Sequence, residues 1–216
     1  MDNKRGIDSC KLLIDANDVE YDVRLIKEVY EVYYDYHLTG EIIKTHENKP
    51  LQIKNIGCDT YYGIVNLFGK RFIYVLVNSK ILRHRYFDSI QSDTIYDVFI
   101  EIKRQGIIEL DYKTFLNSKP TDIDIKSDFE MFDEPFYRMC NDRKKSLVYP
   151  KFFQSRPNLG IEYVKRTTAT PSNPYVKYYS KCAELETRSK IFKDEYLPHF
   201  HNMSLRRCEV ISKVYV

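Results

Sequence analysis

The chain has 216 residues, of which 34 are basic and 31 acidic, so its formal net charge is +3. This length is sufficient to bury an apolar core, and the small net charge does not by itself mark a nucleic-acid-binding protein. No apolar run approaches the ~18 residues of a membrane span, so a membrane protein is not expected. The seven glycines form neither a phosphate-binding loop nor a dinucleotide fingerprint, which argues against nucleoside-triphosphate chemistry.

The five cysteines are scattered and contain no Cys-x-x-Cys pair. Such a set predicts neither a disulfide framework nor a zinc knuckle, and it favours a reducing compartment such as the cytoplasm. The chain also has 19 tyrosines and no tryptophan, together with many lysines, isoleucines and asparagines. An AT-rich coding sequence produces this composition, so the abundance of tyrosine is not itself evidence of function.

The first part of the chain predicts strands and one helix. Residues 6–14 mostly alternate apolar and polar side chains, which is typical of a strand with one buried face. Residues 18–36 place apolar side chains at helical spacing and predict an amphipathic helix. Further strands are predicted at residues 51–57, 60–67 and 71–77.

A second helix is predicted after Ser92, which stands at an N-cap position, and Gly106 provides its C-terminal stop. A short strand follows at residues 107–110. The Lys-Pro dipeptide at 119–120 then predicts a break before an Asp-rich strand at residues 121–128.

The second half combines an irregular segment with alternating strands. Residues 131–157 contain three prolines and many charges, and they predict a long functional or mobile excursion. The remaining predicted elements are a strand at 160–166, a loop at 167–174, a strand at 173–181, a helix at 182–196 and a strand at 205–213.

These elements together predict an α+β fold, an antiparallel sheet with helices packed on one face. We expect residues 1–216 to form a single domain. Because the chain stops within or just after a predicted strand, the alternative that it is the N-terminal part of a longer protein stays open.

The Asp-rich strand places Asp122, Asp124 and Asp128 on one face. Three carboxylates on one face are costly unless a cation or basic groups neutralise them, so they are candidate metal ligands. The alternative is an exposed edge strand whose charges prevent aggregation. Glu209, which follows two arginines in the last strand, is a further candidate ligand or a member of an ordinary cross-strand ion pair.

The strand at 173–181 places Tyr179 on the same face as Lys177 and Lys181, whereas Tyr178 points the other way, toward the core. A tyrosine hydroxyl can attack a phosphodiester when lysines or a metal stabilise the transition state. Tyr179, Lys177 and Lys181 are therefore candidate catalytic residues, and simple packing is the alternative for each tyrosine.

Basic residues with few acidic neighbours occupy residues 151–181, interspersed with tyrosines. This pattern suits a nucleic-acid backbone with bases stacked on rings, although a solvated basic face would look the same. The candidate DNA-binding residues are Lys165, Arg166, Arg206 and Arg207.

His199, Phe200 and His201 form a His-hydrophobe-His triplet. On a strand this spacing places both imidazoles on one face, where they could bind a metal. The triplet follows Pro198, so a loop beyond a helix C-terminus is the alternative.

The order of these motifs resembles that of rolling-circle replication initiators of phages and plasmids, especially replication-initiation proteins of large AT-rich phages. The similarity is strong in the second half of the chain and general in the first half. The matching pieces are residues 121–128, 160–163, 173–185 and 206–213.

The resemblance implies an endonuclease that nicks one DNA strand through a tyrosine and a divalent cation, Mg or Mn, leaving a 5′-phosphotyrosyl link and a free 3′-hydroxyl. Asp124 and Asp128 match the carboxylate pair of the family, and Glu209 matches its Arg-x-Glu carboxylate. Tyr179 and Lys181 match its Tyr-x-Lys segment. The implied partners are single-stranded or origin DNA and host replication proteins, in the host cytoplasm if a phage encodes the chain.

Relatives often begin the Asp motif with arginine, where this chain has Asp122. Several other tyrosines stand in plausible places for the nucleophile. Two rival classes stay open, a DNA-binding module without catalysis and a phage structural or interaction protein. The sequence predicts no oligomeric state.

Overall fold

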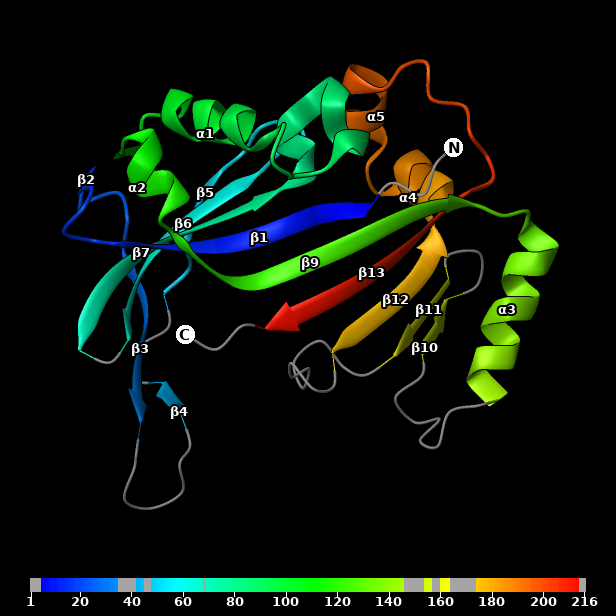
Figure 1. The fold of residues 1–216 in the computed structure, drawn as a ribbon, viewed down its shortest axis with the longest axis horizontal. Coiled ribbons are helices and arrows are strands. Elements are labelled where there is room, and N and C mark those ends of the chain that lie inside the picture. Colours follow the sequence, from blue (N-terminus) through cyan, green and yellow to red (C-terminus); the bar gives the residue numbers. More distant parts are fainter. Residues whose placement is uncertain are drawn as a thin grey trace.

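The structure is a computed structural model that describes residues 5–34, 42–44, 48–67, 69–145, 154–156, 160–163 and 174–213. Within these ranges the fold is α+β, as the element pattern predicts. A curled, mostly antiparallel sheet forms its centre, and helices lie around the sheet (Figure 1).

The main sheet has eleven strands. They are β1 (Arg5–Asp15), β3 (Glu28–Tyr34), β4 (Ile42–Lys44), β5 (Leu51–Ile53), β6 (Thr60–Leu67), β7 (Lys70–Asn78), β9 (Lys119–Glu130), β10 (Gln154–Arg156), β11 (Gly160–Tyr163), β12 (Tyr175–Ser180) and β13 (Leu205–Lys213). Their spatial order is β10-β11-β12-β13-β9-β1-β7-β6-β3-β4, with β5 beside β6. Among the pairs in the described residues, β3 and β6 alone run parallel. A separate pair joins β2 (Glu20–Tyr21) and β8 (Ile108–Glu109).

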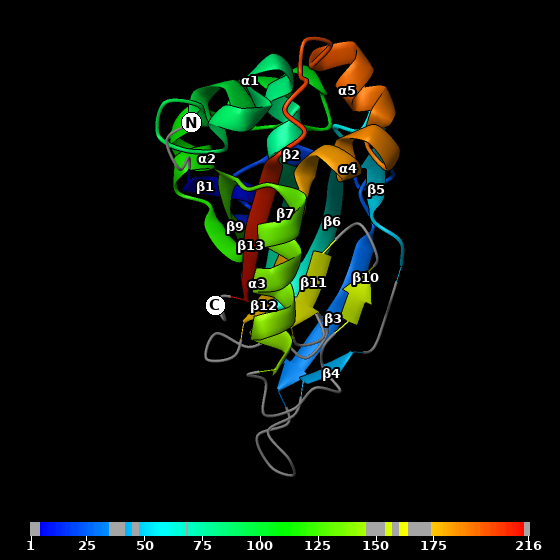
Figure 2. The same ribbon diagram turned by 90° about the vertical axis from the view of Figure 1, so that its right-hand side faces the viewer.

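The helical segments are η1 (Ser79–Asp88), a 3-10 segment, α1 (Ile95–Arg104), α2 (Tyr112–Leu116), α3 (Asp133–Lys145), α4 (Lys181–Thr187) and α5 (Lys190–Tyr196). α1 and α2 cover the half of the sheet that contains β6, β7 and β1 (Figure 1). Figure 2 shows α3 beside the other half, in front of β11 to β13. α4 and α5 pack with η1 at one end of the sheet.

The largest apolar core lies between α1 and the centre of the sheet. Val98, Phe99 and Ile102 stand at helical spacing on α1 and are buried. They join a cluster that includes Leu12 of β1 and Val75 of β7, both of which face this helix by strand alternation. The first half of the sheet is therefore stabilised mainly by burial of apolar surface.

The opposite face of the sheet is charged where β9, β13 and β12 meet. Cross-strand partners in an antiparallel sheet share a face, and here Asp128 pairs with Arg207 while Glu209 pairs with both Lys126 and Lys177. We call this surface the charged face, and its members are Asp124, Lys126, Asp128, Lys177, Tyr179, Arg207 and Glu209.

The strongest sequence patterns are confirmed. The strands predicted at 6–14, 60–67, 71–77, 173–181 and 205–213 correspond to β1, β6, β7, β12 and β13. The predicted short strands at 51–57, 107–110 and 160–166 correspond to β5, β8 and β11, although residues 164–166 lie outside the described residues, as does the predicted loop at 167–173. The helix expected after Ser92 is α1, but its N-cap is Thr94 and not Ser92, and Gly106 follows the helix with a φ of 65°.

The helix predicted at residues 18–36 is wrong, because this segment contains β2, a turn and the whole of β3. The carboxylate of Asp22 accepts a hydrogen bond from the backbone N–H of Arg24 at 2.8 Å, which forms a local turn instead of a helix. Val23, expected on the apolar face, is 63% exposed. Tertiary pairing of β3 with β6 overrides the helical spacing of the apolar residues.

The irregular excursion predicted at residues 131–157 is also wrong, because it contains α3 and β10. Phe136 and Cys140 lie four residues apart on α3 and are buried against the sheet. Pro135 is compatible with this helix because it stands in the first turn, where its missing N–H is not needed.

Two predicted boundaries also differ from the structure. The single helix expected at residues 182–196 is divided into α4 and α5 at Ser189, whose φ of −114° and ψ of 24° are not helical. The break expected before residue 121 is absent from the described chain, since Pro120 lies within β9 opposite Leu12 of β1. A register shift between Lys11 and Leu12 accommodates this proline.

Candidate functional site

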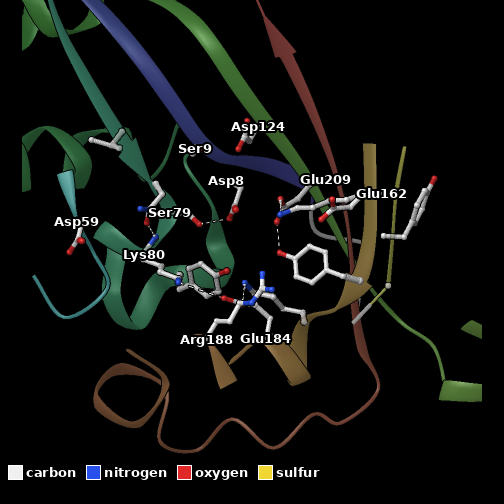
Figure 3. A pocket seen from close by; sticks show the side chains of 18 of the residues that line it. Asp8, Ser9, Asp59, Ser79, Lys80, Asp124, Glu162, Glu184, Arg188 and Glu209 are labelled. Carbon is white, nitrogen blue, oxygen red and sulfur yellow. Dashed lines mark hydrogen bonds and ion pairs between the residues drawn. The ribbon is translucent and has the colours of Figure 1, made fainter. Parts of the chain in front are cut away.

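A cavity of about 350 Å³ opens on the charged face of the sheet (Figure 3). Its walls come from β1, β7, η1, β12, β13 and α4, so segments from both ends of the chain build it. The charged residues that line it are Asp8, Asp59, Asp124, Glu162, Glu184, Glu209, Lys80, Lys177, Lys181 and Arg188, and the lining tyrosines are Tyr61, Tyr86, Tyr178 and Tyr179.

Tyr179 lies on the cavity wall beside Glu209. The Tyr179 hydroxyl donates a hydrogen bond to Oε1 of Glu209, whose other oxygen lies 2.5 Å from Nζ of Lys177. The Lys177 ammonium also lies 4.6 Å from the centre of the Tyr179 ring. Glu209 is only 3% exposed, so its carboxylate is held between these two neighbours.

Tyr179 is protonated at neutral pH in this environment. Burial raises the pKa of its hydroxyl well above the ordinary value, and the Glu209 carboxylate acts in the same direction, while Arg207 opposes both. A reaction at this hydroxyl therefore requires a proton acceptor, and Glu209 already accepts its hydrogen bond.

Arg207, two residues before Glu209 on β13, is fully buried and connects β13 with β9, β1 and η1. Its Nε and Nη2 atoms donate to the two carboxylate oxygens of Asp128 at 2.6 and 2.8 Å. Its Nη1 atom donates to Asp8 at 2.9 Å and to the hydroxyl of Tyr86 at 2.7 Å. This bidentate geometry fixes the guanidinium as a structural centre of the site.

Lys126 is also fully buried, on β9 between these carboxylates. Its Nζ atom lies 3.7 Å from an oxygen of Asp8 and 3.7 Å from one of Asp128. It donates a hydrogen bond to the backbone carbonyl of Tyr86 at 3.2 Å and lies 4.5 Å from the centre of that ring. Burial and the nearby Arg207 lower the pKa of Lys126 to about 7, against the opposing effect of the two carboxylates.

Lys181 begins α4 because Ser180 caps that helix, accepting a hydrogen bond from the backbone N–H of Ala183 at 3.3 Å. Its ammonium lies 2.5 Å from Glu184, which also pairs with Lys80 at 3.8 Å. Burial and the nearby guanidinium lower the pKa of Lys181 to about 8. Lys181 is thus an ammonium group that can lose its proton close to neutral pH.

The structure brings five of the predicted site residues to the cavity wall, namely Asp124, Lys177, Tyr179, Lys181 and Glu209. Tyr178 contributes to the cavity lining, but strand alternation turns its side chain to the opposite face, where it is partly buried against the cluster that contains Phe136.

Arg206 and Arg207, two of the four predicted DNA-binding residues, are buried and not placed for direct phosphate contact. Arg206 is 1% exposed and faces away from the cavity, where it pairs with Asp133 and lies 5.1 Å from the Phe136 ring. Arg207 is buried beneath the cavity. Lys165 and Arg166 lie outside the described residues.

The three carboxylates proposed as metal ligands do not fit a common metal site. Asp124 and Asp128 stand four residues apart on β9, about 13 Å along an extended strand. Asp128 is occupied by Arg207, and Glu209 is occupied by Lys177 and Tyr179. Within the described ranges, no group of three His, Cys, Asp or Glu side chains has a geometry that could hold a metal ion.

His199 and His201 follow α5 in a non-helical, non-strand segment, and both side chains are exposed. Neither lines the cavity. Their position matches the loop alternative rather than a strand-based metal site.

The sequence reasoning missed Asp8, Lys126, Tyr86 and Glu184. The signal for Lys126 was present, because strand alternation places it on the same face as Asp124 and Asp128. Asp8 gave no such signal. It stands at a register shift between Ile7 and Ser9 in the pairing of β1 with β9, and no sequence pattern marks this irregularity.

Neither a family model nor a curated protein sequence matches the chain. In the described part of the chain, no helix combines the length and apolar character needed to cross a bilayer. The chemistry of the cavity is therefore the basis on which a function can be proposed.

Proposed function

We propose that the chain is a DNA-nicking endonuclease of the replication-initiator type, in which Tyr179 attacks a backbone phosphate. The observation that carries the proposal is the hydrogen bond from Tyr179 to the buried Glu209 on a cavity wall that also contains Lys177 and Lys181. A tyrosine with an adjacent base and two lysines is the arrangement that nucleophilic attack on a phosphodiester requires.

The arrangement of the motifs supports the same reading. The Asp-rich, Tyr-x-Lys and Arg-x-Glu segments are distant in sequence, yet they form the neighbouring strands β9, β12 and β13. Their side chains share one face around one cavity. The three motif segments therefore form one site, as expected for an initiator-like nuclease, and are not three unrelated strands on the surface.

In the proposed step, Oη of Tyr179 attacks the phosphorus and its proton moves to Glu209. The bond between phosphorus and the 3′ oxygen breaks, leaving a 5′-phosphotyrosyl link. The ammonium of Lys181 donates a proton to the leaving 3′ oxygen, which becomes a free hydroxyl. Lys177 stabilises the negative charge that develops on the non-bridging oxygens.

The size of the cavity favours single-stranded DNA as the substrate. Its volume of about 350 Å³ lies near the lower end of small-ligand sites, which span roughly 300–1,000 Å³. One nucleotide of an unpaired strand fits such a space, and a duplex does not. Origin DNA and host replication proteins are the partners that this function requires.

The test is a cleavage assay on supercoiled and single-stranded DNA, with and without Mg²⁺ or Mn²⁺, resolved under denaturing conditions after protease digestion. We expect a nicked product with a covalent peptide adduct at Tyr179. Tyr179→Phe should abolish the adduct. The matched control Tyr178→Phe, which alters the neighbouring tyrosine on the opposite face, should retain it.

Other outcomes would distinguish the rival classes. DNA binding without cleavage would identify a non-catalytic DNA-binding module. The absence of both binding at low salt and cleavage would favour a phage structural or interaction protein.

A further inference from the structure

We propose that Lys126 is a built-in cation that takes the place of a divalent metal ion between Asp8 and Asp128. Its ammonium lies 3.7 Å from each of the two aspartates, and Glu209 stands directly opposite it in the strand register. The cluster shares Asp8 with the cavity of the proposed nicking reaction, and of the measurements below only the cleavage assay rests on that reaction.

The charges of the cluster are already balanced. Asp8 and Asp128 carry a charge of −2, and Lys126 and Arg207, which both pair with these two carboxylates, carry +2 while Lys126 is protonated. A divalent ion is attracted to a site by its uncompensated negative charge. Adding one here would place two further positive charges beside buried cations, which is unfavourable.

The position of Lys126 is specified by the fold. A fully buried ammonium is costly unless charged or hydrogen-bonding partners surround it. Tyr86 on η1 supplies such partners, because its carbonyl accepts from Lys126 and its ring faces the ammonium. Lys181 and Arg207 also lie 5.0 and 5.1 Å from this ring, so one tyrosine contacts three cations.

Removal of the ammonium should therefore create a metal site. In Lys126→Ala, the carboxylates of Asp8 and Asp128 would line the space left by the ammonium with one cation fewer, and one or two carboxylates together with bound waters can hold Mg²⁺ or Mn²⁺. Oxygen ligands of this kind prefer Mg²⁺ and Mn²⁺. Lys126→Arg would keep the positive charge, and Lys11→Ala would remove a lysine from the same sheet, where it pairs with Asp122 at 3.7 Å.

The experiment titrates Mn²⁺ into the purified full chain and follows free Mn²⁺ by electron paramagnetic resonance. We expect no stoichiometric binding by the wild type, Lys126→Arg or Lys11→Ala. Lys126→Ala should bind one Mn²⁺ with an affinity at least on the order of 10-fold higher than the wild type. Stoichiometric binding by the wild type at the same affinity would overturn the proposal, and so would the absence of binding by Lys126→Ala.

If Lys126→Ala does not fold in metal-free buffer, its refolding is followed by circular dichroism on addition of Mn²⁺. Refolding with Mn²⁺ but not with an equal ionic strength of NaCl would support the proposal, and no refolding in either would overturn it. The cleavage assay with a chelator is a separate arm. Nicking that a chelator abolishes and Mn²⁺ restores would overturn the inference, whereas the absence of nicking would leave the Mn²⁺ titration as the deciding test.

Discussion

The guanidinium of Arg207 and the carboxylate of Asp128 form two parallel hydrogen bonds across the pairing of β13 with β9. Both side chains are buried, at 0% and 8% exposure. A bidentate pair in this setting holds two strands in register and also fixes the position of the cavity residues that follow on β13.

Removal of one member of this pair should destabilise the fold strongly. Arg207→Ala leaves the carboxylates of Asp128 and Asp8 buried with one cation fewer, so we expect the free energy of unfolding to fall by about 3–5 kcal/mol. Urea denaturation measures this change. Arg138→Ala is the control, because Arg138 forms an exposed helical pair with Glu134 and should matter by less than about 0.5 kcal/mol. A similar loss for both variants would contradict the assigned role of Arg207.

Glu209→Gln should separate proton transfer from DNA binding. Glutamine can still accept a hydrogen bond from Tyr179 but cannot take its proton, so the rate of nicking should fall by roughly 10²–10⁴. Binding of single-stranded DNA, measured by fluorescence anisotropy, should change little. If the nicking rate stays within a factor of two of the wild type, Glu209 is not the proton acceptor.

The rate of nicking should decrease as the pH rises through about 8. The pKa of Lys181 is lowered to about 8 by burial, so its ammonium is present below this pH and is progressively lost above it. Loss of the proton removes both the charge and the proton donor at the leaving oxygen. Lys181→Arg, which stays charged, should lower the maximal rate and remove the decline. A decline at the same pH in that variant would assign it to another group.

Glu184 should make stability depend on pH in the acid range. Burial raises the pKa of Glu184, but the ammonium groups of Lys181 and Lys80 outweigh burial and lower the pKa to about 2. A folded-state pKa below the unfolded value contributes stability above about pH 4.5, and this contribution is lost as the pH falls toward 2. The difference in unfolding free energy between the wild type and Glu184→Gln should therefore shrink below about pH 4.5. A difference that does not vary between pH 6 and pH 3 would refute this coupling.

Strand alternation made half of the site predictable from the sequence. Side chains two residues apart on a strand share a face, which places Tyr179 with Lys177. The order of the motifs along the chain predicts that Glu209 belongs to the same site. The register between neighbouring strands could not be predicted from the sequence, because it depends on pairings between segments more than 70 residues apart. The pairing of Arg207 with Asp128 is an example. The sequence alone therefore predicts Asp128 as a metal ligand and gives no sign that its carboxylate accepts two hydrogen bonds from Arg207.

Two kinds of local ambiguity account for the errors in the fold. The apolar residues of 18–36 fit a helix by spacing, and only the partner strand β6 decides that the segment from Glu28 is extended. In residues 131–157, the prolines and charges concealed a helix that is stabilised by packing of Phe136 rather than by its own propensity.

The position of β1 between β7 and β9 has a consequence for how the protein is made. Strands β1, β6 and β7 with α1 form an apolar core from residues near the N-terminus, and this part can collapse early during synthesis. The buried charges of Asp8, Lys126 and Asp128 acquire Arg207 only when β13 is inserted next to β9. We therefore expect the half of the sheet that contains β9, β12 and β13 to order last and cooperatively, so that an incomplete chain exposes an unpaired β9 edge that can associate with other chains.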